Sequence, residues 1–297
     1  MLESRLGEFA ALLTALCWTF GAIAFEIACK RAGALAVNWI RLAIGFILLV
    51  VFCTCYRNLP FPTDASLRTW LWLSLSGVIG FSIGDTLLFR AFAVIGSRIS
   101  MLIMSIVPPI TAFLGWIVMG EVLGVLGFLG MVLTVGGILM VVLERKKDQV
   151  QSKYPLSGVL MALGGAVGQS VGLVLSKYGM GNYNAFAATQ IRILAGIIGF
   201  SVLFFFLKRW GTIGQAMKDR KTLTPISIGA FLAAFLGVSF SLLAVQHTTT
   251  GVASTIMAIV PVLIIPPAVL IFKEKVSLKE VVGAFIAVSG VAVLFIR

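Results

Sequence analysis

The chain alternates between long apolar runs and short polar connections. Ten runs are each close to the roughly 20 apolar residues that a helix needs to cross a bilayer. Their approximate ranges are 7–28, 35–55, 70–92, 97–118, 122–143, 156–177, 185–207, 225–246, 251–272 and 279–296. The runs are continuously apolar, whereas the strands of a membrane barrel would alternate between apolar and polar residues. The pattern therefore predicts an all-α integral membrane protein with ten transmembrane helices.

The two halves of the chain repeat one pattern. A shift of 151 positions superposes pairs of identical residues, among them Gly7 and Gly158, Gly21 and Gly172, Arg41 and Arg192, Gly45 and Gly196. Further along, the shift is 153 positions, and the identical pairs include Gly84 and Gly237, Met104 and Met257, Pro108 and Pro261, Glu121 and Glu274. We therefore expect a five-helix repeat at 1–143, a basic linker at 144–154 and a second five-helix repeat at 155–297. Because five is odd, the repeats must be inverted relative to each other, as in many secondary transporters.

Composition narrows the class of protein further. The chain is 60% hydrophobic and only 11% charged, with a mean hydropathy of +1.08, whereas soluble domains have about 25% charged residues. A soluble globule is thereby excluded. The net charge of +12 comes largely from short basic runs between apolar segments, such as 145–147 and 218–221. Loops beside membrane helices carry such charge and contact anionic lipid, so membrane lipid rather than nucleic acid is the expected partner. We expect a multi-pass protein of a prokaryotic plasma membrane.

Short motifs fall at matching places in the two halves. They are Cys-Trp-Thr-Phe-Gly at 17–21, Ile-Arg-Leu/Ile at 40–42 and 191–193, small-residue runs ending in proline at 98–108 and 251–261, Gly-Glu and Lys-Glu at 120–121 and 273–274, and glycine turns at 136–138 and 289–291. Together they resemble the drug/metabolite transporter superfamily, and within it the ten-helix EamA-type permeases. The resemblance implies a carrier of small molecules, since relatives export amino acids and other metabolites, carry nucleotide sugars or exchange sugar phosphates.

Two features depart from that resemblance. Small multidrug relatives use a carboxylate in the middle of the first helix, whereas residues 14–18 contain none. This counts against proton-coupled efflux of cationic drugs by that route. Relatives also usually keep both termini in the cytoplasm, yet the basic runs at 145–147, 208–209 and 218–221 lie on the face opposite to the termini. The positive-inside rule then places the termini outside, and both orientations remain open.

Arg41 and Arg192 are the first candidates for substrate binding. Each lies about six residues inside an apolar run. A charge near the membrane centre costs at least about 2.5–3.5 kcal/mol, so each arginine should face protein or a wet cavity. The duplicated position places both near the pseudo-twofold axis, where two cations can bind a carboxylate or phosphate. Alternatively, each arginine snorkels to the interface or holds a neighbouring helix.

Asp85 is the one acidic residue deep in an apolar run, and the repeat places Val238 at the matching position. A lone carboxylate in a membrane helix can load and release a proton or bind a cation, so proton coupling is one hypothesis. The alternative is a structural salt bridge to Arg41 or Arg90.

Other side chains are weaker candidates. Four add hydrogen-bonding groups or an aromatic wall to a substrate site, or else join helices to each other: Asn38, Gln169, Gln190 and Trp18. Three prolines interrupt the fourth helix of each half and are expected to kink it, line the pathway and hinge its gates: Pro108, Pro109 and Pro261.

These features favour a secondary transporter that moves a small polar metabolite by alternating access, with export of amino acids or related compounds as the expected direction. The sequence has no P-loop motif for direct ATP use, and its single histidine argues against a metal site or a catalytic set, so we expect no enzyme and no cofactor. The alternatives are a lipid-handling or structural membrane protein, or an importer or exchanger of phosphorylated or nucleotide-linked metabolites. Monomer and homodimer both remain open.

Overall fold

The computed structural model describes residues 5–143, 155–264, 266–267 and 277–296, and every element within these ranges is helical. Seven helical segments are long and apolar enough to cross a membrane: Leu6–Ala32, Ala34–Arg57, Leu67–Ser97, Ile99–Met119, Leu156–Met180, Ala185–Leu207 and Arg220–His247. Three shorter apolar helices accompany them: Val125–Met140, Thr250–Leu263 and Val281–Leu294. The predicted all-α class is confirmed for the described residues. All ten segments fall on the ten predicted runs, and the count of ten full spans stays a prediction.

Several of these segments are built from more than one helix. The first half contains α1 (Leu6–Ala32), α2 (Ala34–Arg57), α3 (Leu67–Gly77), η2 (Val78–Asp85), α4 (Thr86–Ile103), η3 (Met104–Ile106), α5 (Val107–Met119) and α6 (Val125–Leu143). The second half contains α7 (Leu156–Met180), α8 (Ala185–Leu207), α9 (Trp210–Lys218), α10 (Arg220–Gly229), η4 (Ala230–Gly237), α11 (Val238–His247), α12 (Thr250–Met257), α13 (Val260–Leu263) and α15 (Leu278–Ile296).

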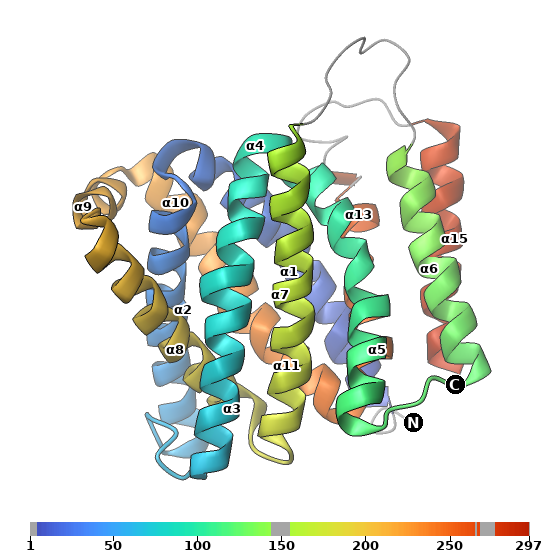
Figure 1. Ribbon diagram of the computed structural model, residues 1–297, viewed down its shortest axis with the longest axis horizontal. Helices are drawn as coiled ribbons and strands as arrows, with labels where there is room; N and C mark the ends of the chain where they lie inside the picture. The colour runs from blue at the N-terminus through green and yellow to red at the C-terminus, as the bar shows by residue number, and fades with distance from the viewer. Residues whose placement is uncertain (1–4, 144–154, 265, 268–276, 297) are drawn as a thin grey trace.

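The long helices stand side by side, and α6 packs against α15 to form a pair beside the main bundle (Figure 1). The two ends of the chain lie at the same edge of the bundle as the connection between α5 and α6 (Figure 1). The end of α6 and the start of α7, which flank the predicted linker, lie at the opposite edge. We call these two edges the terminal face and the linker face.

One glycine separates two of the predicted spans. Gly96 has a φ of 78° inside the range of α4, which is the left-handed region that a residue with a side chain rarely adopts. The helix therefore breaks there, and the next residue, Ser97, donates its backbone N–H to Glu26 Oε2 at 3.0 Å. The break coincides with the predicted boundary between the runs 70–92 and 97–118.

The first helix of each half packs against the third segment of the other half. α1 contacts α10, η4 and α11, and α7 contacts α3, η2 and α4. A Cβ added at Gly172 would lie 3.1 Å from Gly80 Cα, and one added at Gly21 would lie 2.6 Å from Ala233 Cβ. These two contacts join repeat-related positions. Small residues at both allow the helices to approach closely.

A second feature also falls at repeat-related positions. η2 and η4 are both π-helices of eight residues, each at the middle of the third segment of its half. π-Helical turns are rare and occur frequently at functional sites, because they change the direction in which side chains project. η2 ends at Asp85, the buried carboxylate singled out from the sequence.

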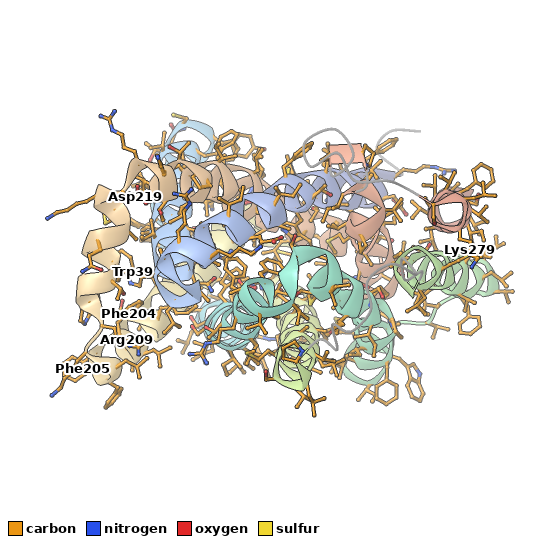
Figure 2. All side chains as sticks on the ribbon, turned by 90° about the horizontal axis from the view of Figure 1, so that it is seen from above. Trp39, Phe204, Phe205, Arg209, Asp219 and Lys279 are labelled. Carbon is orange, nitrogen blue, oxygen red and sulfur yellow. The ribbon has the colours of Figure 1, made fainter. Side chains whose placement is uncertain are left out.

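The polar connection after α8 contains a short helix, α9, which the hydrophobic pattern did not predict. Its buried face consists of Ile213 and Ala216, too few apolar residues to stand out in a basic segment. Trp210 packs edge-on against Trp39, with ring centroids 6.2 Å apart, while Arg209 projects from the bundle (Figure 2). Tryptophan beside basic residues is typical of a membrane–water interface.

Candidate functional site

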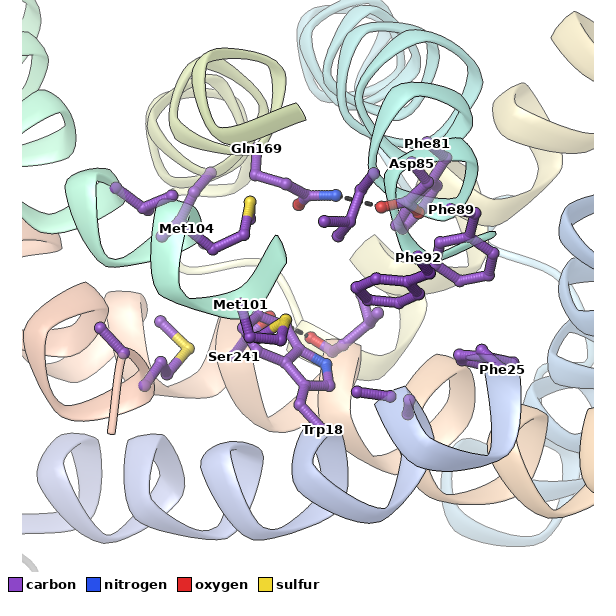
Figure 3. A pocket seen from close by; sticks show the side chains of 18 of the residues that line it. Trp18, Phe25, Phe81, Asp85, Phe89, Phe92, Met101, Met104, Gln169 and Ser241 are labelled. Atoms are coloured by element: carbon purple, nitrogen blue, oxygen red, sulfur yellow. Dashed lines mark hydrogen bonds between the residues drawn. The ribbon is translucent and has the colours of Figure 1, made fainter. Parts of the chain in front are cut away.

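A cavity of about 970 Å³, including space open to solvent, lies between helices of both halves. Among the described residues, three charged side chains line it: Arg41, Asp85 and Arg192. Eight further lining residues are aromatic or sulfur-containing: Trp18, Phe25, Phe81, Phe89, Phe92, Met101, Met104 and Met257. Figure 3 shows Trp18 and Met101 on one side of the space and Asp85, Phe89 and Phe92 on the other. The cavity is therefore largely apolar, with a small charged group in its wall.

Asp85 is the centre of that charged group. Arg41 donates to Asp85 Oδ2 in an ion pair, and Gln169 donates to Asp85 Oδ1 (Figure 3). Asn38 forms a hydrogen bond with each member of the pair. Its Oδ1 accepts from Arg41 Nε at 2.8 Å, and its amide donates to the backbone oxygen of Asp85 at 3.3 Å. Arg41 and Asp85 are each only 4% exposed. Both carboxylate oxygens of Asp85 are thus engaged by protein groups.

Local helix geometry places these partners. Asn38 and Arg41 are three residues apart on α2 and so lie on one face of that helix. The Arg41 guanidinium carbon lies 4.7 Å from the centre of the Phe89 ring and 5.4 Å from that of Phe25. Cation–π contacts of this kind stabilise a charge that has been removed from water.

Arg192 is in a different situation. It is 3% exposed, and its guanidinium carbon lies 4.8 Å from the centre of the Phe81 ring. Its Nε is buried and has no hydrogen-bond partner in the part of the chain that the structure describes. The charge of Asp85 also acts on Arg192, but within the described part of the chain Asp85 pairs with Arg41 alone. The two repeat-related arginines are therefore not equivalent in this structure.

Most of the candidate binding residues come together here. Trp18, Arg41, Asp85, Gln169 and Arg192 all line the cavity, and Asn38 contacts two of them. Of the two structural partners considered for Asp85, the structure contains the pair with Arg41.

Gln190 lies elsewhere. Its side chain is fully buried and donates to the backbone oxygen of Pro60 at 2.6 Å, in the connection that follows α2. Gln190 is not among the residues that line the cavity, so in this conformation it would not contact a substrate bound there.

The predicted prolines start helices at two breaks. Pro108 lies in the first turn of α5, directly after the 3-10 turn η3, and Pro261 lies in the first turn of α13. Met104 and Met257, each four residues before one of these prolines, line the cavity, whereas Pro109 is exposed. The breaks, rather than the proline rings, therefore contribute to the wall. A hinge role for the three prolines stays a prediction.

The sequence pattern indicated Trp18 as an aromatic wall but not the phenylalanines that line the cavity. Phe81, Phe89 and Phe92 follow the spacing of Asp85 along the helical segment, four residues before it and four and seven after it. Residues at this spacing share a helix face, so the buried carboxylate itself was the available signal. Phe25 had no comparable signal, because it belongs to α1 and meets this face only in the folded bundle.

A second polar cluster lies at the terminal face. Glu121 Oε1 pairs with Lys177 Nζ at 2.5 Å, and Glu121 Oε2 accepts from the backbone N–H and hydroxyl of Thr250 at 2.8 and 2.7 Å. The cluster joins the end of α5 to the end of α7 and the start of α12. At the linker face Glu26 accepts from the N–H of Ser97, the residue related to Thr250 by the repeat. The predicted counterpart of Glu121, Glu274, lies outside the described residues together with Lys273.

We expect Glu121→Gln to lower the free energy of unfolding by about 1 kcal/mol, because an ion pair that keeps some exposure to solvent contributes about that much. The glutamine can still accept from Thr250, so the change removes chiefly the pair with Lys177. Thermal unfolding in detergent measures the loss. Lys177→Met should cost a similar amount, and the double variant should lose little more than either single one. Fully additive losses would show that the two side chains do not act together.

A third polar cluster joins the loops at the terminal face through hydrogen bonds. Tyr183, between α7 and α8, donates to Asp64 at 2.7 Å, and Arg57 also donates to Asp64 at 2.5 Å. Partial burial and the hydrogen bond to Asp64 raise the pKa of Tyr183 to about 12. Tyr183 therefore keeps its proton, and the bond to Asp64, throughout the physiological pH range.

Comparison with known proteins shows which family has this sequence and fold. The model of the EamA-like transporter family matches residues 5–143 and 156–296, almost the whole described chain. The chain belongs to the EamA-like transporter family. This EamA-like protein is therefore a multi-pass membrane transporter with a small-molecule substrate and a lipid environment.

Curated relatives and a solved structure agree with this assignment. "Putative ribose uptake protein RbsU" of Staphylococcus epidermidis is 25% identical over 254 residues, covering 83% of both chains. Its counterpart in a second strain of that species is 24% identical over the same length and coverage. A crystal structure matches 97% of this EamA-like chain and 94% of its own, with a TM-score of 0.74 and 14% identity. At that identity the match shows the fold alone.

Proposed function

We propose that this EamA-like transporter binds a small polar metabolite in the central cavity and carries it across a prokaryotic plasma membrane by alternating access. The observation that carries the proposal is the buried group of Arg41, Asp85 and Arg192 in the cavity between the halves. Charges inside a membrane protein are costly and mark substrate or ion pathways. In secondary transporters the site lies where the repeats meet.

Alternating access requires two units that rock against each other, and we propose two inverted five-helix repeats, 1–143 and 155–297, for this role. Three features support the proposal. The sequence halves match, the first helix of each half packs against the third segment of the other, and π-helices η2 and η4 occupy matching places. The cavity lies between these units, so rocking would expose it to one face at a time.

Two substrate classes are proposed. Export of amino acids or related compounds is the first, because such substrates carry a carboxylate that suits the two arginines. Uptake of a sugar is the second, because the staphylococcal relatives are named for ribose uptake and flat aromatic walls with a few polar groups suit small ring compounds. In either case a proton on Asp85 would release Arg41, which is the proposed route to proton coupling.

A tryptophan that fills the cavity should block transport. We expect Ala258→Trp to reduce transport at least tenfold, because Ala258 lines the cavity and the indole would occupy substrate space. Untargeted mass spectrometry of media and washed cells, from cultures matched for membrane abundance, measures the effect. Ile198→Trp is the matched control, since Ile198 is 56% exposed on the outside of α8 and should leave transport unchanged.

The outcome also decides the direction of transport. A metabolite enriched in the medium only with active protein supports export, and one enriched in cells supports uptake. A change in membrane lipids alone would favour the lipid-handling alternative. If wild-type and Ala258→Trp cultures both match the empty vector, the proposed transport of a polar metabolite is rejected.

A further inference from the structure

The two repeats differ at the position of Asp85. Arg41 and Arg192 are related by the repeat, and so are the positions of Asp85 and Val238. The first half therefore has an arginine with a carboxylate, and the second half has an arginine with an apolar side chain. Arg192 and Val238 both line the central cavity.

This difference leaves one cation without its own counterion. Arg41 is occupied by Asp85 and Asn38, whereas Arg192 Nε is buried without a hydrogen-bond partner among the described residues. The described part of the cavity lining contains two arginines and one aspartate, so it carries a formal charge of +1 when Asp85 is ionised. A buried, unpaired cation is unfavourable unless a ligand pairs with it.

We propose that Arg192 is the anchor for an organic monoanion, whose carboxylate pairs with the guanidinium while its apolar body packs against the aromatic and methionine wall. The inference rests on the proposed function and names the substrate class for the same cavity. A planar guanidinium is suited to a carboxylate because it can donate two parallel hydrogen bonds. Phe81 lies against Arg192, and Phe89, Phe92 and Met101 continue the apolar wall from there.

Charge balance favours this class over its rivals. One carboxylate brings the cavity to neutrality, whereas a doubly charged phosphate would leave an excess negative charge in an apolar surrounding. A cation would add to the charge already present. A neutral sugar would leave Arg192 uncompensated.

The test restores the symmetry of the repeat. Val238→Asp would place a carboxylate in the cavity and supply Arg192 with an internal counterion. Purified protein in lipid nanodiscs would be titrated with 3-phenylpropionate, with its primary amide as the neutral isostere, and with ribose, using thermal stabilisation as the readout. We expect wild type to respond to the carboxylate at concentrations at least tenfold lower than to the amide or ribose. Val238→Asp should raise the carboxylate concentration needed at least tenfold.

Two further variants separate charge from shape and folding. Val238→Asn is the matched control, which adds a similar polar side chain without charge and should keep carboxylate binding within about threefold of wild type. Arg192→Gln removes the cation and should abolish the preference for the carboxylate over the amide, so it tests the proposal even if Val238→Asp does not fold.

Three results would overturn the inference. They are a wild type that responds equally to the carboxylate and its amide, a carboxylate preference that survives in Arg192→Gln, and stabilisation by ribose alone. The Ala258→Trp comparison stands apart from these titrations. If Ala258→Trp blocks transport while the carboxylate preference is absent, the substrate class is wrong and the proposed transport function is retained.

Discussion

Arg41→Ala is expected to lower the free energy of unfolding by about 3–5 kcal/mol, whereas Arg192→Ala should change it by less than about 1 kcal/mol. The contrast follows from the pairing of Asp85. Removal of Arg41 leaves a buried carboxylate that has lost its ion pair, and Asn38 loses the donor to its side-chain oxygen. Removal of Arg192 loses contact with Phe81 but also removes an unpaired buried charge. Denaturant unfolding of the purified proteins in mixed micelles measures both values.

The comparison has an internal control. Asp85→Asn should destabilise the protein in the same range as Arg41→Ala, because it leaves Arg41 without its counterion. The double variant Arg41→Ala/Asp85→Asn should then recover part of the loss, since no unpaired member of the ion pair remains. Equal destabilisation by Arg41→Ala and Arg192→Ala would contradict the assignment of Asp85 to Arg41.

The sequence was informative about the fold because the membrane allows so few solutions. A chain in lipid must satisfy its backbone hydrogen bonds within each segment, so ten apolar runs translate directly into helical segments. The position of Gly96 at a predicted boundary follows from its tolerance of positive φ. The hydrophobic pattern did not predict α9. An interfacial helix needs only a narrow apolar face, here Ile213 and Ala216, and two apolar residues do not stand out in a polar segment.

The charged members of the site were predictable from the sequence, but their pairings were not. Arg41, Asp85 and Gln169 stand out from the sequence because polar groups are rare inside apolar runs. The choice between Arg41 and Arg90 as the partner of Asp85 depends on how η2 turns the carboxylate, and no periodicity specifies a π-helix. The same limit applies to Gln190, whose carbonyl partner belongs to a loop rather than to a facing helix.

The interface between α7 and η2 should tolerate little added volume. We expect Gly168→Leu to lower the free energy of unfolding by about 3 kcal/mol or more and to reduce transport at least tenfold, because overpacking of a tight contact forces backbones apart. A Cβ added at Gly168 would lie 2.8 Å from Gly84 Cα, and backbone cannot move aside as the end of a flexible side chain can. Unfolding in mixed micelles and the metabolite comparison measure the two effects.

Gly168→Leu should reduce transport in two ways, by destabilising the bundle and by displacing a residue of the cavity wall. The next residue, Gln169, donates to Asp85, so a displaced α7 would withdraw a hydrogen bond from the charged group in the cavity. Gly136→Leu is the matched control, because a Cβ at Gly136 in α6 would meet nothing within 4 Å. Equal tolerance of the two leucines would show that α7 does not need to approach η2 this closely. A stable Gly168→Leu protein without transport would instead assign the close approach to the placement of Gln169 rather than to the cohesion of the bundle.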